Sequence, residues 1–226
     1  GTLALNFKLT YDGDPISMYE DRYEYADGTS IFFDRFNLFL SNITLLENTP
    51  DQQRVLKDVA FLDYAQTQDE TTAQEGITIE LTDIPVGNHE GLNIGLGLTP
   101  ELNATTPADY STNHPMANNY WEQWNSYISM VVEGKADTTG NGMHDLVLTY
   151  HIGKDPSYAD YPLKKNFEIK SDEMTTMYLE FDLKKLFTKD GEPLDIRKYP
   201  IDHSSNEYVY DFIRLNMVEA MSVSAE

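Results

Sequence analysis

Apolar residues recur at every second position in short runs that follow one another closely along the chain. The clearest of these runs span residues 3–11 and 77–81, and a two-residue period is typical of half-buried strands. Other apolar runs cover residues 30–46, 55–64, 127–133, 146–152, 167–169 and 177–183. Because the connections between them are too short for regular βαβ units, we expect a mostly β protein, an antiparallel β-sandwich with long loops.

Two segments depart from this period. From Val209 to Ala220 apolar residues recur at helical spacing, behind the capping sequence Ser204-Ser205-Asn206-Glu207, so we expect one C-terminal helix. From Thr99 to Asn119 the chain is polar and contains prolines, which predicts a long loop of the kind that is usually functional or mobile. The length of 226 residues predicts one sandwich domain over residues 1–226.

The charge of the chain is strongly acidic. It has 38 Asp and Glu against 16 Lys and Arg, a formal net charge of -22. Nucleic-acid affinity comes largely from cationic side chains that displace counterions, so we expect no nucleic-acid partner. An acidic surface concentrates cations, although it also serves solubility alone.

The sequence contains no cysteine, which excludes internal disulfides, thiolate zinc sites and cysteine nucleophiles. No apolar run approaches the roughly 18 residues that a membrane-spanning helix needs, so we expect no transmembrane segment. The chain opens at Gly1 without a basic region or an apolar leader. We therefore expect any signal peptide or lipoprotein anchor cysteine to lie upstream.

The best functional lead is a group of soft ligands and indoles. One short stretch contains His114, Met116, Trp121 and Trp124, and His151 follows in a later apolar run. Neutral imidazole and thioether suit copper better than hard cations such as magnesium. The sequence therefore predicts a low-coordinate copper site of His114, His151 and Met116, whose affinity falls when the imidazoles are protonated.

An expected strand over residues 146–152 gives this site its geometry. Val147, Thr149 and His151 would share one face of the strand, and His151 would stand near its end, where the loop carrying His114 could reach it. In the alternative interpretation, His114 is an ordinary loop residue, His151 a surface histidine and the two indoles packing anchors.

A series of short motifs spans nearly the whole chain. In order they are Leu5-Asn6-Phe7, Phe39-Leu40-Ser41-Asn42-Ile43, Asp63-Tyr64, Tyr120-Trp121-x-x-Trp124-Asn125-x-Tyr127, Glu133-Gly134, His151-Ile152-Gly153, and Asn216 with Ala220. This order resembles the MbnP-like family of secreted bacterial proteins. The chain departs from the family pattern at Ser126, where a glycine would be expected before the tyrosine.

The resemblance implies a β-rich, non-enzymatic protein that handles copper in the periplasm or, anchored to the outer membrane, at the cell surface. It also implies a partner, a dihaem peroxidase-like protein that oxidises a tryptophan to kynurenine. Carried over to this chain, Trp121 or Trp124 is the modifiable indole and Tyr127 lines the site. His114 and His151 are then the candidate copper ligands.

A second candidate site lies in residues 137–145. Oxygen-bearing side chains at alternate positions before a glycine are typical of calcium loops, and the weak candidates for ligands are Asp137, Thr139, Asn141 and Asp145. Leu148 stands where such a loop has its bidentate glutamate. A hairpin with Asn141-Gly142 at its tip explains the same residues, and we favour the hairpin.

Two other functional classes stay open. The loop from Thr99 to Asn119, with exposed aromatic residues, would serve a surface adhesion or glycan-binding module without metal equally well. A carboxylate-based hydrolase would need two facing acids in a cleft. His89 and His203 carry no nucleophile signal and are expected at the surface.

Overall fold

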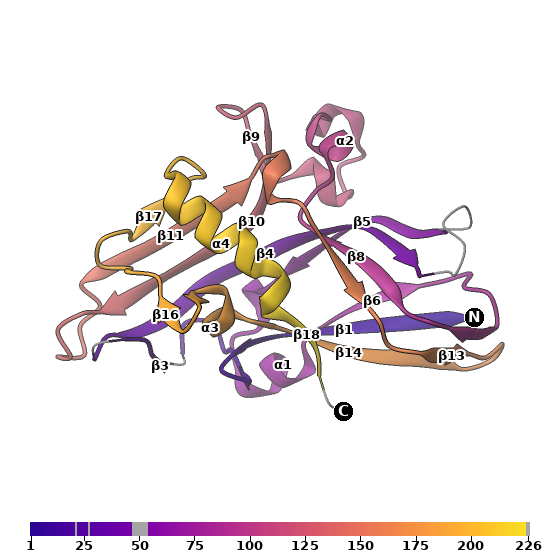
Figure 1. The fold of residues 1–226 in the computed structure, drawn as a ribbon, viewed down its shortest axis with the longest axis horizontal. Helices are drawn as coiled ribbons and strands as arrows, with labels where there is room; N and C mark the ends of the chain where they lie inside the picture. The colour runs from indigo at the N-terminus through magenta and orange to yellow at the C-terminus, as the bar shows by residue number, and fades with distance from the viewer. Residues whose placement is uncertain (21, 27, 47–53, 225–226) are drawn as a thin grey trace.

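Two sheets form the two layers of the computed structural model, which describes residues 1–20, 22–26, 28–46 and 54–224 (Figure 1). The strands of the first sheet are β1 (Thr2–Tyr11), β2 (Asp14–Pro15), β6 (Ile77–Leu81), β14 (Met174–Asp182) and β18 (Met221–Val223). They follow the order β18-β14-β1-β2, and β6 also pairs with β1. This sheet mixes orientations, because β1 and β14 run parallel while the other pairs are antiparallel.

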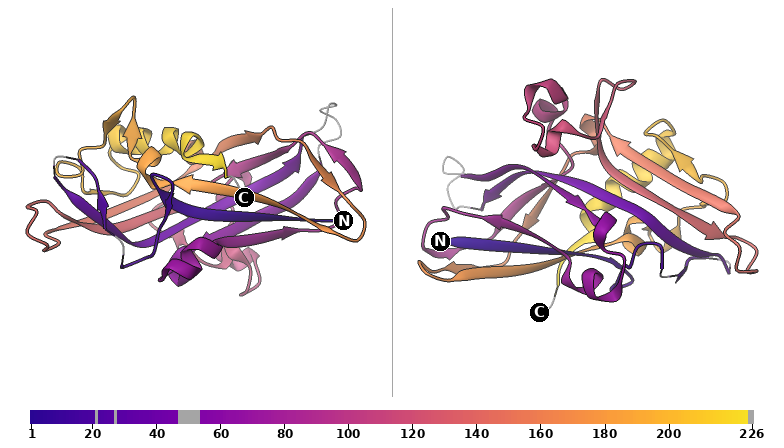
Figure 2. Two further views of the ribbon diagram at one scale, coloured as in Figure 1. Left: turned by 90° about the horizontal axis from the view of Figure 1, so that it is seen from below. Right: turned by 180° about the vertical axis from the view of Figure 1, so that it is seen from behind.

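The second sheet is larger. Its strands are β3 (Tyr23–Glu24), β4 (Ser30–Leu45), β5 (Val55–Asp63), β8 (Leu92–Leu96), β9 (Tyr120–Trp121), β10 (Ser126–Asp137), β11 (Leu146–Gly153), β12 (Ala159–Leu163) and β17 (Ile201–Asp202). The order is β12-β8-β4-β10-β11-β17, and β3 and β5 also pair with β4, and β9 with β10. Here β11 and β17 run parallel. Figure 2 shows the same two layers from two further sides.

Helices and short ribbons surround the layers. The helices are α1 (Glu70–Glu75), α2 (Pro100–Asn103), α3 (Leu183–Leu186) and α4 (Glu207–Ala220), with 3-10 turns η2 (Tyr64–Gln66), η3 (Pro107–Asp109), η4 (Pro115–Ala117) and η5 (Asp155–Ser157). The ribbons pair β7 (Gly87–His89) with β13 (Phe167–Ile169) and β15 (Thr188–Lys189) with β16 (Glu192–Pro193). Because α4 contacts β14 and β18 of the first sheet and β11 and β12 of the second, it closes one side of the sandwich. None of the helices in the described ranges is long and apolar enough to cross a bilayer.

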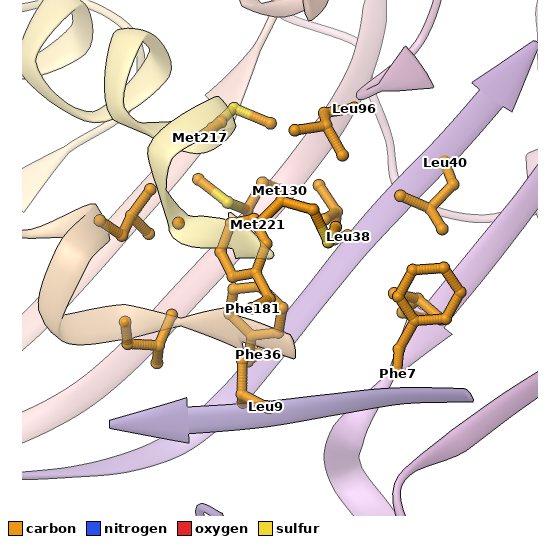
Figure 3. Packing of buried hydrophobic residues seen from close by; sticks show 14 of the residues in the cluster. Phe7, Leu9, Phe36, Leu38, Leu40, Leu96, Met130, Phe181, Met217 and Met221 are labelled. Carbon is orange, nitrogen blue, oxygen red and sulfur yellow. The ribbon is translucent and has the colours of Figure 1, made fainter. Parts of the chain in front are cut away.

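The main core fills the space between the sheets. Alternate residues of the long strands point into it, together with side chains of α4. The close view shows Phe7, Leu9, Phe36, Leu38, Leu40, Leu96, Met130, Phe181, Met217 and Met221 (Figure 3). Each large side chain that leaves water in this way contributes about 1.5–3 kcal/mol to stability. The predicted β-rich sandwich is confirmed, with two parallel strand pairs in addition to the antiparallel ones.

Both segments that depart from the two-residue period have regular structure. The predicted C-terminal helix is α4, and Asn206 caps it by accepting a hydrogen bond from the Val209 amide at 3.3 Å. The predicted loop from Thr99 to Asn119 instead contains α2, η3 and η4. It packs on the outer face of the second sheet, the face that points away from the first sheet, and covers a second core cluster of Phe39, Val59, Leu98, Met116 and Tyr127.

Candidate metal centre

His151 projects from the outer face of the second sheet. In β11 the alternate residues Leu148, Tyr150 and Ile152 are buried in the main core, so the side chain between the last two points outward. The predicted face of Val147, Thr149 and His151 is therefore confirmed. The His151 Nε2 atom lies 2.7 Å from Oε1 of Glu133 on the neighbouring strand β10.

The parallel strand β17 brings His203 beside His151. Thr149 pairs with Ile201 and Tyr150 with Asp202, and beyond these pairs the two imidazole rings stack with centroids 4.7 Å apart and an interplanar angle of 17°. His203, which we expected at the surface, is partly exposed, and its ring stacks on that of His151.

Ser204 holds the two strand ends together. Its hydroxyl donates to the His151 carbonyl oxygen at 2.9 Å and accepts from the Gly153 amide at 3.1 Å. Two residues earlier, Asp202 is buried and its carboxylate accepts from the Asn206 amide at 2.8 Å, where the chain turns into α4. The start of α4 and the position of His203 are therefore fixed by the same short segment.

Trp121 lies against this histidine pair, and Trp124 stacks on Trp121. Trp121, at the end of β9, has its ring centroid 5.4 Å from that of His151 and 5.1 Å from that of His203. Trp124 follows in the turn between β9 and β10 and stacks on Trp121 at 4.9 Å. A Cβ atom at Gly153 would come within 2.8 Å of the Trp124 ring, so glycine at this position leaves room for the second indole.

The environment of His151 favours the neutral form of its imidazole. Burial lowers the pKa of the ring, and this effect exceeds the opposing hydrogen bond to Glu133. A neutral imidazole whose Nε2–H group donates a hydrogen bond to a carboxylate has its free lone pair on Nδ1. That Nδ1 atom is buried and has no hydrogen-bond partner among the described residues.

An irregularity in β10 follows directly after Glu133. The pairing of β10 with β4 shifts between Glu133 and Gly134, and a Cβ atom at Gly134 would lie 2.2 Å from the Phe32 carbonyl oxygen. Only glycine allows the two strands to approach so closely. The Glu133 carboxylate also lies 3.5 Å from Arg35 Nη1, so Arg35, Glu133 and His151 form a chain across three strands.

The motifs that build this histidine and indole cluster lie within residues 1–206, and the profile of the MbnP family matches this range. The chain belongs to the MbnP family. Among solved structures, MbnP from Methylosinus trichosporium is similar, with a TM-score of 0.55 and 14% identity over 83% of this chain and 77% of that chain. A likeness at this identity indicates a shared fold. No curated protein matches the chain.

In this member of the MbnP family, the structure places His114 and Met116 in a different neighbourhood from His151. His114 caps η4, and its Nδ1 atom accepts a hydrogen bond from the Met116 amide at 3.2 Å. Its ring stacks on Tyr110 at 4.4 Å. Met116 is fully buried in the second core cluster, where its side chain packs against apolar neighbours.

Tyr127, expected to line the site, also belongs to the second core cluster. It is fully buried, and its hydroxyl donates to the Met116 carbonyl oxygen at 3.0 Å. The preceding residue, Ser126, pairs with Trp121 in the short β9–β10 ladder. Tyr127 therefore supports the base of the hairpin that carries the indoles, and its ring contacts Phe39 and Tyr120.

The predicted hairpin at residues 137–145 is confirmed, since it joins the antiparallel strands β10 and β11. Asp137 accepts from the amides of Thr139, Gly140 and Gly142, and Asp145 accepts from the amide and hydroxyl of Thr138. The Asn141 side chain accepts from the Met143 amide. Burial would raise the pKa of Asp137, but the hydrogen bonds to its carboxylate lower it. The oxygen atoms of the calcium-loop candidates thus organise the turn itself.

Acidic and imidazole side chains do not converge densely anywhere in the described ranges. There, no group of three His, Cys, Asp or Glu side chains has the spacing of a metal site. A centre that relies on many hard oxygen ligands has no counterpart in this part of the chain. The His151 and His203 pair, with one unpaired buried nitrogen, is the arrangement that offers soft donors.

Proposed function

We propose that this MbnP-family protein binds copper through His151 and His203, with Trp121 beside the ion, and that it acts without catalysing a reaction. The observation that carries the proposal is the buried Nδ1 atom of His151, which lacks a hydrogen-bond partner among the described residues. Leaving a buried polar atom unpaired costs about 1–3 kcal/mol. A bound metal ion would offset that cost.

The donor set fits copper better than calcium or magnesium. Imidazole suits copper, whereas calcium and magnesium take several oxygen ligands. Glu133 would act as the outer partner that fixes the His151 tautomer, a role that carboxylates commonly have toward metal-bound histidines. Copper affinity should fall at low pH, because protonated imidazoles cannot bind the ion.

Membership of the MbnP family also supports two further parts of the proposal. The protein would be exported, to the periplasm or the cell surface, and a dihaem peroxidase-like partner would oxidise one indole. Trp121 is the better candidate for this indole, since its ring contacts both His151 and His203, whereas Trp124 contacts Gly153. Trp121, like Trp124, is partly exposed.

Copper affinity of paired variants tests the metal site. His151→Ala/His203→Ala should weaken copper(I) binding, measured by competition with a chromophoric chelator, by about 100-fold or more, because even an outer partner of a ligand changes affinity by roughly 10- to 100-fold. The matched control His114→Ala/Met116→Leu should bind as the parent does. Equal affinity of the parent and the His151/His203 variant would contradict the assignment.

Intact-protein mass spectrometry tests the indole. In material from the native host, we expect oxidation of Trp121, which Trp121→Phe should remove and Trp124→Phe should leave in place. Oxidation that survives in Trp121→Phe and disappears in Trp124→Phe would reverse the assignment of the two rings.

A second candidate function is glycan binding. A cleft of about 340 Å³ runs beside Trp124 and is lined by polar groups that include Asn103, Asn125 and Lys154, a combination that suits a sugar ring. A glycan-array screen with metal analysis separates the two functions. Sugar binding that Trp124→Ala abolishes, with no copper retained, would favour the glycan module.

A further inference from the structure

A second cleft lies on the outer face of the second sheet, on the other side of Glu133 from the histidine pair. Its volume is about 540 Å³, within the usual range of small-ligand sites. Its lining includes Asp34, Arg35, Asn37, Phe61, Asp63 and Glu133. They come from three neighbouring strands, β4, β5 and β10.

The strand register sets this cleft apart from the metal centre. Asp63 pairs with Asn37, Asn37 with Val131, and Val131 with His151. These four residues form one row of cross-strand neighbours, with the cleft at one end of the row and His151 at the other. Val131 is fully buried between them. The cleft can thus be altered without a change to either histidine.

Asn37 carries a polar atom that lacks a partner. The side chain lines the cleft and is only 2% exposed, and its Oδ1 atom makes no hydrogen bond within the part of the chain that the structure describes. An amide oxygen is an acceptor with two lone pairs. A hydrogen-bond donor that enters the cleft would pair it.

The charges of the cleft favour a cation. The carboxylates of Asp34, Asp63 and Glu133 outnumber the one guanidinium in its lining, that of Arg35. Burial, and then the charge of Glu133, raise the pKa of Asp34, and these effects exceed the opposing charges of Lys135 and Arg35. The aromatic ring of Phe61 lines the same cleft, and a cation is attracted to the face of such a ring.

A single metal ion does not fit these groups. Among the described residues, no three acidic or imidazole side chains have metal-site spacing, so the carboxylates are spread along the cleft. An aliphatic ammonium ion suits that spread, because its N–H groups donate to carboxylate and amide oxygens while its methylene groups pack against an aromatic ring.

We propose that this cleft binds an aliphatic ammonium group, either a free polyamine or a lysine side chain of a partner. The ammonium would donate to Asn37 Oδ1 and to the carboxylates of Asp34 and Asp63. The proposal does not rest on copper binding, although Glu133 lines the cleft and also contacts His151.

Titration calorimetry with spermidine and with N-acetyl-lysine amide tests the proposal in the full chain. Asp34→Asn/Asp63→Asn should weaken binding by about tenfold or more, because it removes two charge-assisted hydrogen bonds. Asp63 Oδ1 accepts a capping hydrogen bond from the Ala65 amide. Asp63→Asn keeps an oxygen atom that can accept the same bond. The single variant Asp34→Asn should show a smaller loss in the same direction.

The chain carries a net charge of -22, so the control must remove the same charge elsewhere. Asp190→Asn/Glu192→Gln does so in a distant acidic cleft and should leave affinity within about twofold, since distant surface charges are screened by salt. Binding of either probe that follows this pattern supports the proposal, and the tighter probe identifies the source. Equal losses in both double variants, or no binding of either probe, would overturn it.

Discussion

His151 and His114 lie in two regions of the same outer face, and they differ in which ring nitrogen remains available. In His151 the Nε2 atom is engaged by Glu133, and the Nδ1 atom is buried and unpaired among the described residues. In His114 the Nδ1 lone pair accepts from the Met116 amide, so the neutral ring carries its proton on Nε2. A histidine can bind a metal ion only if the fold leaves the lone pair of one ring nitrogen without a hydrogen bond.

The two regions also differ in what holds the ring. His151 stands on a central strand between β10 and β17, and Trp121 and His203 contact its ring. His114 stands on the segment that covers the second core cluster, and its ring stacks on Tyr110. The first region presents donor atoms, whereas the second maintains packing.

Among variants that distinguish the two regions, we expect the largest change in the free energy of unfolding from a substitution at Met116. Met116→Ala should lower the free energy of unfolding by about 2–5 kcal/mol, because it leaves a cavity in the second core cluster. Met116→Leu, which keeps the volume, should cost less than about 1.5 kcal/mol. Urea denaturation measures both, and copper affinity should not change in either. A folded Met116→Leu variant with weakened copper binding would make the thioether a ligand after all.

The next effect concerns Glu133. Glu133→Gln should weaken copper binding by about tenfold, since an amide holds the His151 tautomer less firmly than a carboxylate does. Arg35→Gln, which removes only the outermost member of the chain, should have a smaller effect on the same chelator competition. An unchanged affinity in Glu133→Gln would show that the tautomer of His151 does not depend on this contact.

The smallest effect concerns His114. His114→Ala should cost about 0.5–1.5 kcal/mol of stability, the usual value of one hydrogen bond, because it removes the acceptor for the Met116 amide. Thermal unfolding measures this loss, and copper affinity should equal that of the parent. A loss of copper affinity larger than the loss of stability would break the distinction between the two regions.

Local patterns predicted much of the fold. The two-residue period gave the strands and the outward face of His151, because the side-chain direction of a strand follows from sequence spacing alone. The capping sequence before Val209 gave the C-terminal helix for a similar reason. The hairpin after Asp137 was equally predictable, since its hydrogen bonds join residues close in sequence.

The partner of His151 could not be predicted in this way. His203 reaches it through β17, a strand of two residues with no readable period, in a parallel pairing with Thr149 and Tyr150 far earlier in the chain. The one local signal was its place just before the capping sequence of α4, which fixes a turn there. His114 was chosen instead because it is close to the indoles in sequence, although its ring packs on Tyr110.

The most direct test of the account follows the ring nitrogens themselves. Long-range proton–nitrogen NMR correlations of the histidine side chains, recorded at neutral pH before and after addition of copper(I), report which nitrogen carries a proton and which binds the metal. We expect a neutral His151 protonated at Nε2, whose Nδ1 resonance shifts on copper addition together with a His203 resonance, while His114 is unchanged. A copper-induced shift at His114 with no change at His151 would contradict it.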